Sequence, residues 1–241
     1  MTGTFINVGT ILLGTLLGSL LGHRLPEGLQ HRVLAGLGLA TLVLGVDDAL
    51  AWRHTNALYV IGGVLLGGLA GEALRIEDRL AGLGDALQRR FGTPAPAGAA
   101  AGAHRSLAEG FFVASLLFCV GPLAVLGAIQ DGLAGDYDTL ATKALLDGFA
   151  AIALASSLGV GVGFSAASVL VYQGAITLAA GLFEHVLAPG SEALAALTSA
   201  GGILIIGIAL KLLDIKDVKV GNFLPALVFA PCLVGLVSLV R

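Results

Sequence analysis

Charged side chains are scarce in this sequence. Aspartate, glutamate, lysine and arginine make up 12 % of its 241 residues, whereas a soluble domain carries about a quarter. With 56 % hydrophobic residues and a mean hydropathy of +0.94, the chain cannot cover a water-facing surface with charge. The composition therefore predicts an integral membrane protein whose surroundings are the lipid bilayer. The net charge of −3 lacks the basic balance of nucleic-acid-binding proteins, so no nucleic-acid partner is expected.

Cysteine is almost absent, and so are the short motifs of common enzymes. Cys119 and Cys232 both lie in apolar segments, where we expect buried small side chains and neither a disulfide nor a metal pair. No HExxH or GxSxG motif occurs, nor a glycine-rich phosphate loop followed by Lys-Ser/Thr. We therefore expect no enzyme, no cofactor and no nucleotide-driven pump. The first apolar run follows MTGT without a basic leader, which favours a retained helix over a cleaved signal peptide.

Glycine, in contrast, is abundant, with 36 residues. Each glycine weakens a soluble helix by roughly 0.5–1 kcal/mol relative to alanine, but in lipid small residues let helix backbones approach closely. Four GxxxG spacings would serve either packing within the chain or a homodimer. They are Gly14–Gly18, Gly18–Gly22, Gly63–Gly67 and Gly67–Gly71.

The apolar residues form eight segments, which predict a single all-α polytopic transmembrane domain over residues 1–241. The segments are 5–22, 32–47, 56–73, 109–130, 142–160, 164–187, 194–212 and 221–240. The second and third are short for a ~30 Å hydrocarbon core, so we expect them to be tilted, thinned around glycines or partly re-entrant.

A polar stretch at about 74–106 separates the third segment from the fourth. Its first part has Leu80, Leu83 and Leu87 at helical spacing, which predicts an amphipathic surface helix. Its second part, GTPAPAGAAAGAH, is typical of a disordered linker.

Whether residues 142–187 cross the membrane once or twice decides on which side of it every later loop lies. This stretch is long enough to cross a ~30 Å core twice at about 1.5 Å per helical residue. Its only plausible turn is the run Gly159-Val160-Gly161-Val162-Gly163, where three glycines permit a tight reversal. We therefore predict a hairpin of two membrane helices.

The lysines and arginines support this hairpin. With eight crossings, one side of the membrane carries Arg53, Lys143 and Arg241. The other side carries Arg24, Arg32, Arg75, Arg79, Arg89, Arg90, Arg105, Lys211, Lys216 and Lys219. Ten against three is a strong positive-inside bias, and merging the hairpin into one span weakens it to seven against six. We therefore expect the 74–106 loop in the cytoplasm and both termini outside it.

The first three and last three segments share a rhythm that favours an inverted repeat around a central helix pair. Gly9 and Gly36 are 27 residues apart, as are Gly174 and Gly201, and an asparagine (Asn56 or Asn222) opens each third element. Because two helices intervene, the second copy enters the membrane from the opposite side, as in many secondary transporters. Chance similarity between glycine-rich segments is the alternative.

Asp147 is the first candidate for chemistry, because a carboxylate inside a span costs roughly 2.5–3.5 kcal/mol and usually faces a cavity or partner. It serves either as an ion or proton site, or as a helix-end stabiliser paired with Lys143 one turn earlier. Gly121-Pro122 falls in the middle of the fourth segment, where proline frees an upstream carbonyl for a neighbouring helix, a water or a cation. An ordinary proline kink is the alternative.

Polar residues in other segments complete the candidate ion or substrate path. Asn7, Gln173 and Asn222 offer amides either to a cation or as hydrogen bonds between helices. Glu72 lies at the cytoplasmic end of the third segment, where a boundary carboxylate is commonly just solvated. We place Cys119 on the path beside the Gly121-Pro122 break.

Motifs along almost the whole chain resemble the YqgA/YdfK family of prokaryotic inner-membrane proteins, a domain of unknown function. They are the FIN-initiated glycine series Phe5 to Gly18, Gly71-Glu72, Phe118-Cys119-Val120-Gly121, Gly135-Asp136 through Lys143 to Asp147, IKDVKVGNFLPAL at 215–227, and Ala230-Pro231. The resemblance implies a multi-pass protein of the prokaryotic cell membrane and, as an expected activity, a sodium channel or pump. It supplies no functional residues.

The sequence thus favours an ion channel or secondary transporter for a monovalent cation, Na⁺ or H⁺, with Asp147 as the charged ligand. The alternatives are a non-transporting membrane scaffold, in which Asp147 only stabilises a helix end, and a transporter of a small metabolite. A polar, water-filled cavity around Asp147 would favour transport, and dry close packing would favour the scaffold.

Overall fold

The computed structural model describes residues 1–22, 26–91, 107–183 and 186–240, and these form helices and their connections. The elements are α1 (Thr2–Gly22), α2 (Glu27–Ala49), η1 (Leu50–His54), α3 (Ala57–Leu74), α4 (Ile76–Phe91), α5 (Leu107–Cys119), α6 (Pro122–Ala134), α7 (Asp138–Leu158), η2 (Gly159–Phe164), α8 (Ser165–Leu178), α9 (Ala180–Phe183), α10 (Glu192–Leu212), η3 (Val220–Phe223) and α11 (Ala226–Val240). The predicted all-α class is confirmed for the described part of the chain.

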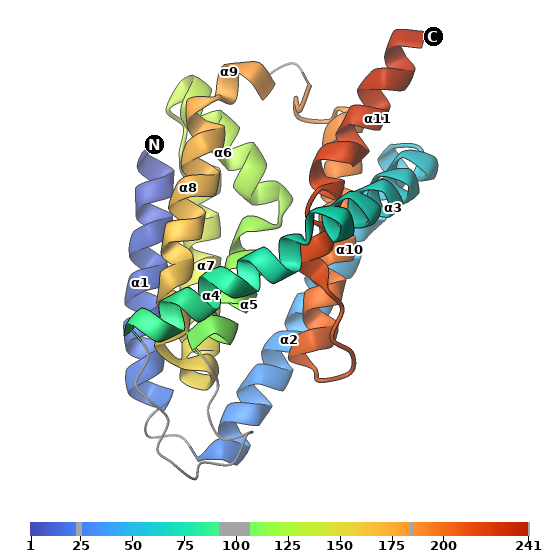
Figure 1. Ribbon diagram of the computed structural model, residues 1–241. Coiled ribbons are helices and arrows are strands. Elements are labelled where there is room, and N and C mark those ends of the chain that lie inside the picture. The colour runs from blue at the N-terminus through green and yellow to red at the C-terminus, as the bar shows by residue number, and fades with distance from the viewer. Residues whose placement is uncertain (23–25, 92–106, 184–185, 241) are drawn as a thin grey trace.

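The helices gather into two groups, which Figure 1 shows on the left and right of the molecule. In the first group α1 packs against α7 and α8, and α6 packs against α8. In the second group α10 packs against α2 and α11, and α11 packs against α3. The short helix α5 contacts α8 of the first group and α10 of the second. Both chain ends lie toward the same end of the molecule (Figure 1).

Six described helices are long and apolar enough to cross a membrane, or seven if the bent pair α5 and α6 counts as one. Length and composition therefore do not confirm the predicted count of eight. The expectation that the second segment is short is wrong, because α2 has 23 residues and a length of about 34 Å. Its first turns are polar and the helix begins at Glu27, ahead of the apolar run.

One of the six candidates is the continuous stretch Asp138–Leu178, and helix contacts show that it folds back on itself. Gly14 of α1 packs against Gly148 of α7, and Gly18 packs against Ile152, so α1 and α7 run parallel. The helix α8 instead runs antiparallel to α1, because Asn7 meets its later part and Thr15 meets Gly163 just before it. The predicted hairpin is therefore present.

The reversal occurs in η2, at the glycines that predicted it. Gly159 has a φ of 77°, which side chains other than glycine rarely adopt. Gly161 lies so close to the Leu107 carbonyl that a Cβ atom would clash with it. One glycine is thus needed for its backbone angle and the other for close packing against α5.

The GxxxG glycines pack within the chain. Gly14, Gly18 and Gly22 lie against the backbone of α7, and Gly63 and Gly67 lie against Ala230 and Ala226 of α11. At each position a Cβ atom would meet the neighbouring helix at less than the contact distance of real side chains. Of the two roles that the sequence left open, packing within the chain and a homodimer contact, these glycine faces therefore have the first.

Corresponding helices of the two predicted repeats pack antiparallel, as an inverted repeat requires. Besides α1 with α8, Gly38 of α2 meets Leu213 while Gly45 meets Gly202 of α10, and α3 runs against α11 in the same sense. The hydrogen-bonded residues Asn7 and Gln173 are 166 residues apart, which is the separation of Asn56 and Asn222 and one residue more than that of Gly9 and Gly174. In an inverted repeat, nearly equivalent residues that touch lie close to where the two-fold axis crosses their helix pair. The Asn7–Gln173 contact has this relation in α1 and α8.

The amphipathic helix predicted before the linker is present as α4. It packs against α5, with Gly84 close to Ala108, while Leu80 is partly buried and Leu83 is 57 % exposed. It therefore covers part of the helix bundle rather than lying alone on the surface. The predicted linker lies in 92–106, outside the described residues.

Candidate functional site

The carboxylate of Asp147 lies near the middle of α7 and is buried with an ammonium group. Asp147 is 8 % exposed and Lys143 is 6 % exposed. Their spacing of four residues puts both on one face of the helix, where Lys143 Nζ forms an ion pair with Asp147 Oδ2. Asn7 Nδ2 from α1 donates to the same carboxylate oxygen at 3.0 Å. The carboxylate therefore has two donors from two helices.

The helix break at Gly121-Pro122 supplies the third group of the site. The helices α5 and α6 meet there at a bend of 62°. Because Pro122 has no N–H, it cannot bond the carbonyl of Phe118 four residues earlier. Lys143 Nζ donates to this Phe118 oxygen at 2.8 Å. The freed carbonyl predicted from the sequence thus exists, and its partner is a cation of the chain itself.

Two amides extend the polar cluster to α8. Asn7 Nδ2 also donates to Gln173 Oε1 at 3.3 Å, and both side chains are fully buried. Of the predicted path residues, Asn7, Lys143, Asp147 and Gln173 therefore converge in one place, which we call the midhelix cluster. Its members come from α1, α7 and α8, up to 166 residues apart in the sequence.

Several polar atoms in and beside the midhelix cluster have no hydrogen-bond partner among the described residues. They include Asn7 Oδ1, Gln173 Nε2 and the hydroxyls of Thr4, one turn before Asn7 in α1, and Thr177, one turn after Gln173 in α8. The two threonines were missed by sequence reasoning, although their spacing of three and four residues from the amides puts them on the same helix faces. Each unpartnered buried group costs about 1–3 kcal/mol, and buried water commonly satisfies such groups.

Asn222 and Glu72 belong to a second, separate cluster. Asn222 Nδ2 donates to Glu72 Oε2 at 2.6 Å, and its Oδ1 accepts from the Glu77 backbone N–H at 2.8 Å. The Glu77 carboxylate in turn accepts from the N–H of Gly221 at 2.7 Å. The expectation that Asn222 and Glu72 share one path with Asp147 finds no support in these bonds, which instead tie the start of α4 to η3.

Glu77 was missed by sequence reasoning, and its only signal was an acid in the first turn of the amphipathic helix. Burial raises the pKa of its carboxyl above the usual value, and the hydrogen bond from Gly221 opposes this rise. The cause is loss of hydration, because a buried carboxylate is less stable than the neutral acid.

The two cysteines line a large apolar cavity instead of contacting the midhelix cluster. Cys119 is partly buried and Cys232 is exposed, and both are free thiols. The prediction that Cys232 is buried is wrong, because its side chain is exposed where it lines the open cavity. Cys119 is the residue after Phe118, whose carbonyl accepts from Lys143, and it lies close enough to Lys143 and Asp147 to interact with them electrostatically.

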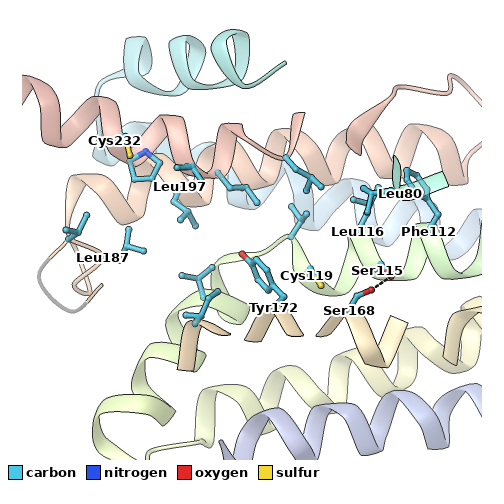
Figure 2. Close-up of a pocket in the computed structure, with 18 of the residues that line it drawn as sticks. Leu80, Phe112, Ser115, Leu116, Cys119, Ser168, Tyr172, Leu187, Leu197 and Cys232 are labelled. Atoms are coloured by element: carbon cyan, nitrogen blue, oxygen red, sulfur yellow. Dashed lines mark hydrogen bonds between the residues drawn. The ribbon is translucent and has the colours of Figure 1, made fainter. Parts of the chain in front are cut away.

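The cavity has a volume of about 820 Å³ and lies between α5 and α8 on one side and α10 and α11 on the other. Figure 2 shows Leu80 and Phe112 at one end and Leu187 and Cys232 at the other. The lining includes exposed residues of α11, such as Val228 at 63 % exposure, so the cavity is open to the medium around the protein.

The long apolar helices, one of which carries a buried ion pair, define a polytopic membrane protein of the all-α class. The chain belongs to the family described as "Protein of unknown function (DUF554)", which matches residues 2–235. It is 31 % identical over 237 residues to "Uncharacterized membrane protein YdfK" of Bacillus subtilis (strain 168), covering 97 % of this chain and 96 % of that one. It is 32 % identical over 233 residues to "Uncharacterized protein YqgA" of Escherichia coli (strain K12), covering 95 % and 94 %. No solved structure matches the chain.

Proposed function

We propose that this protein is an ion channel or secondary transporter for a monovalent cation, Na⁺ or H⁺, with Asp147 as the charged binding group. The observation that carries the proposal is the buried ion pair of Lys143 and Asp147 beside the broken helix. A carboxylate oxygen and a freed backbone carbonyl are the ligands that a small hard cation uses. Here both ligands hold the ammonium of Lys143.

Lys143 acts in this proposal as a tethered cation. An entering cation reaches Asp147 only when Nζ leaves its carboxylate oxygen, and Nζ returns when the cation departs. The protein interior thus never holds the Asp147 carboxylate without a positive partner, a state that costs about 3–5 kcal/mol when a buried pair is broken. A cation therefore passes Asp147 with a low energy barrier when it and the Lys143 ammonium replace each other at the carboxylate.

The unpartnered polar atoms suggest the route to Asp147. Thr4, Thr177 and the two amides form a polar line along the contact between α1 and α8. The line continues toward the start of α1, where the carboxylate of Asp131 pairs with the amino group of Met1 at 2.9 Å. Oxygen atoms without partners are sites for water or for a partly dehydrated cation.

The position of the cluster in the repeat also supports transport. Asn7 and Gln173 meet close to where the pseudo-two-fold axis crosses α1 and α8, and inverted-repeat transporters bind their substrates at the repeat interface near the bilayer midplane. Broken helices are a further feature of such sites, and α5 and α6 supply one here.

The decisive experiment is cation flux into proteoliposomes that contain the purified chain. We expect Asp147→Asn to abolish gradient-driven Na⁺ or H⁺ flux, because the neutral amide lacks the negative charge that balances a bound cation or the Lys143 ammonium. Asp138→Asn is the matched control, since it makes the same change at an exposed position on the same helix and should leave flux unchanged. Wild-type flux in Asp147→Asn would remove this residue from the mechanism.

A second candidate function is a non-transporting membrane scaffold. It is favoured by the fact that Lys143 satisfies Asp147 and the Phe118 carbonyl without any ligand. A thermal-stability screen with Na⁺, K⁺, H⁺ and small metabolites separates the functions, because a ligand that binds only the native state raises its stability by mass action. A scaffold gives no shift with any of them, and a shift with a metabolite alone indicates a metabolite transporter.

For the topology, we propose that both limbs of the α7–α8 hairpin cross the membrane, which gives eight crossings in the prokaryotic cell membrane with both termini outside the cytoplasm. The ten-to-three distribution of basic residues supports this orientation. Labels at both ends should be accessible to an impermeant reagent in intact cells. Protection of either end would reverse the assignment, and crosslinking in membranes would show whether the chain forms a homodimer.

A further inference from the structure

We propose that the apolar cavity between α5, α8, α10 and α11 is a binding site for one acyl chain of a membrane phospholipid. This site is separate from the midhelix cluster, and the proposal does not depend on cation transport. The cavity volume of about 820 Å³ lies within the ~300–1,000 Å³ of pockets that bind small molecules.

The walls of the cavity are apolar over its whole length. Leu116, Val120 and Leu197 form buried parts of the wall, at 5 %, 2 % and 6 % exposure. Three hydroxyls also lie there: Ser115 and Ser168 bond to each other at 2.9 Å, and Tyr172 supplies the third (Figure 2). Walls with so few polar groups offer water few partners, so an apolar occupant fits the cavity better.

The cavity opens sideways along α11, where lining residues face out of the bundle. Val228 and Leu236 line the cavity and are 63 % and 61 % exposed. On a helix that is long and apolar enough to cross a membrane, such an opening faces the acyl chains of the bilayer. The medium next to the opening therefore supplies an occupant of matching chemistry, long and apolar.

One end of the cavity also offers a charge for a lipid headgroup. Lys211 Nζ lies 5.1 Å from the centroid of the Phe112 ring, and Phe112 closes the end where Leu80 of α4 also lies (Figure 2). The ion-pair partner of Lys211 is Asp217, whose side chain is 69 % exposed. Such a pair is weak, so the ammonium can also bind a phosphate group. An acyl chain in the cavity and a phosphate at Lys211 together specify a phospholipid.

The test is retention of phospholipid by the purified full-length chain in mild detergent, measured by native mass spectrometry. Gly235→Phe fills the cavity from α11, because Gly235 lines it and a Cβ there meets nothing within 4 Å. Gly9→Phe is the matched control on α1, which also has open space but does not line the cavity. We expect wild type and Gly9→Phe to retain phospholipid, and Gly235→Phe to retain at least about tenfold less, the change expected when about two buried methylenes are displaced.

A second variant guards against a local effect of Gly235. Ile176→Trp fills the cavity from α8, whereas Val171→Trp places the same side chain on the outer face of that helix, at 72 % exposure. The two cavity variants should lose phospholipid together while both controls keep it. Equal retention in all variants, no retained phospholipid in wild type, or a dimer that seals the opening along α11 without lipid would each overturn the proposal.

Discussion

Replacing Lys143 by methionine tests the reasoning about the buried ion pair most directly. The change keeps a long apolar side chain but removes the ammonium, so both the Asp147 carboxylate and the Phe118 carbonyl lose their donor. Breaking a buried pair costs about 3–5 kcal/mol, and a backbone carbonyl left without a donor adds about 1–3 kcal/mol. We therefore expect a loss of roughly 4–8 kcal/mol in the free energy of unfolding, as the sum of these ranges.

Two companion variants separate the contributions. Lys143→Gln keeps an N–H donor for the Phe118 carbonyl, so it should be less destabilised than Lys143→Met by about 1–3 kcal/mol. The double variant Lys143→Met with Asp147→Asn removes both charges, and replacing a whole buried pair is often nearly neutral. It should therefore be more stable than Lys143→Met alone, which gives a positive coupling in a double-mutant cycle.

The assay is thermal unfolding of the purified protein in detergent, with Na⁺ or choline as the only added monovalent cation. A loss of roughly 4–8 kcal/mol corresponds to ~8–32 °C at this chain length. Under the transport proposal, Na⁺ but not choline should restore part of the stability of Lys143→Met, because Na⁺ takes the place of the ammonium. An unfolding midpoint within 2 °C or so of wild type for Lys143→Met would refute the structural argument. A large loss without Na⁺ rescue would refute only the cation site.

Three further predictions concern other parts of the fold. Gly18→Leu should prevent close packing of α1 on α7 and lower the unfolding midpoint by far more than Gly9→Leu does. Of these two glycines, only Gly18 lies against the backbone of a neighbouring helix. Equal unfolding midpoints of the two variants would contradict this packing. Gly159→Ala should cost about 1–2 kcal/mol in stability because it forces a side chain into a left-handed backbone angle, as chemical denaturation can measure. Burial raises the pKa of Glu77 above its ordinary 4.5, so the contribution of Glu77 to stability is full below pH 4.5 and is lost as pH rises through the higher folded-state pKa. The Glu77→Gln variant should therefore lose less stability than wild type over that rise in pH. Parallel profiles of stability against pH would contradict this prediction.

The sequence by itself determined the features that depend on the local chain. Scarce charge and long apolar runs indicate membrane helices because lipid offers no partner for polar groups. The glycines of 159–163 indicate the reversal because only they tolerate its backbone angles and contacts. The spacing of Lys143 and Asp147 puts them on one helix face, and Pro122 leaves a carbonyl without its helical donor wherever the helix lies. Each of these inferences uses neighbours within a few residues.

Only the tertiary structure decided which distant groups meet. It brought Asn7 to Asp147 across 140 residues, gave the Phe118 carbonyl to Lys143, and tied Asn222 to Glu72 and Glu77 instead of to the midhelix cluster. It also left the apolar cavity between the two helix groups. The physical reason is that helices in lipid are apolar on most of their faces, so the pattern that marks the buried side of a soluble helix is absent. Which faces meet is then set by close fit between glycines and backbones, and that fit exists only when the whole bundle is assembled.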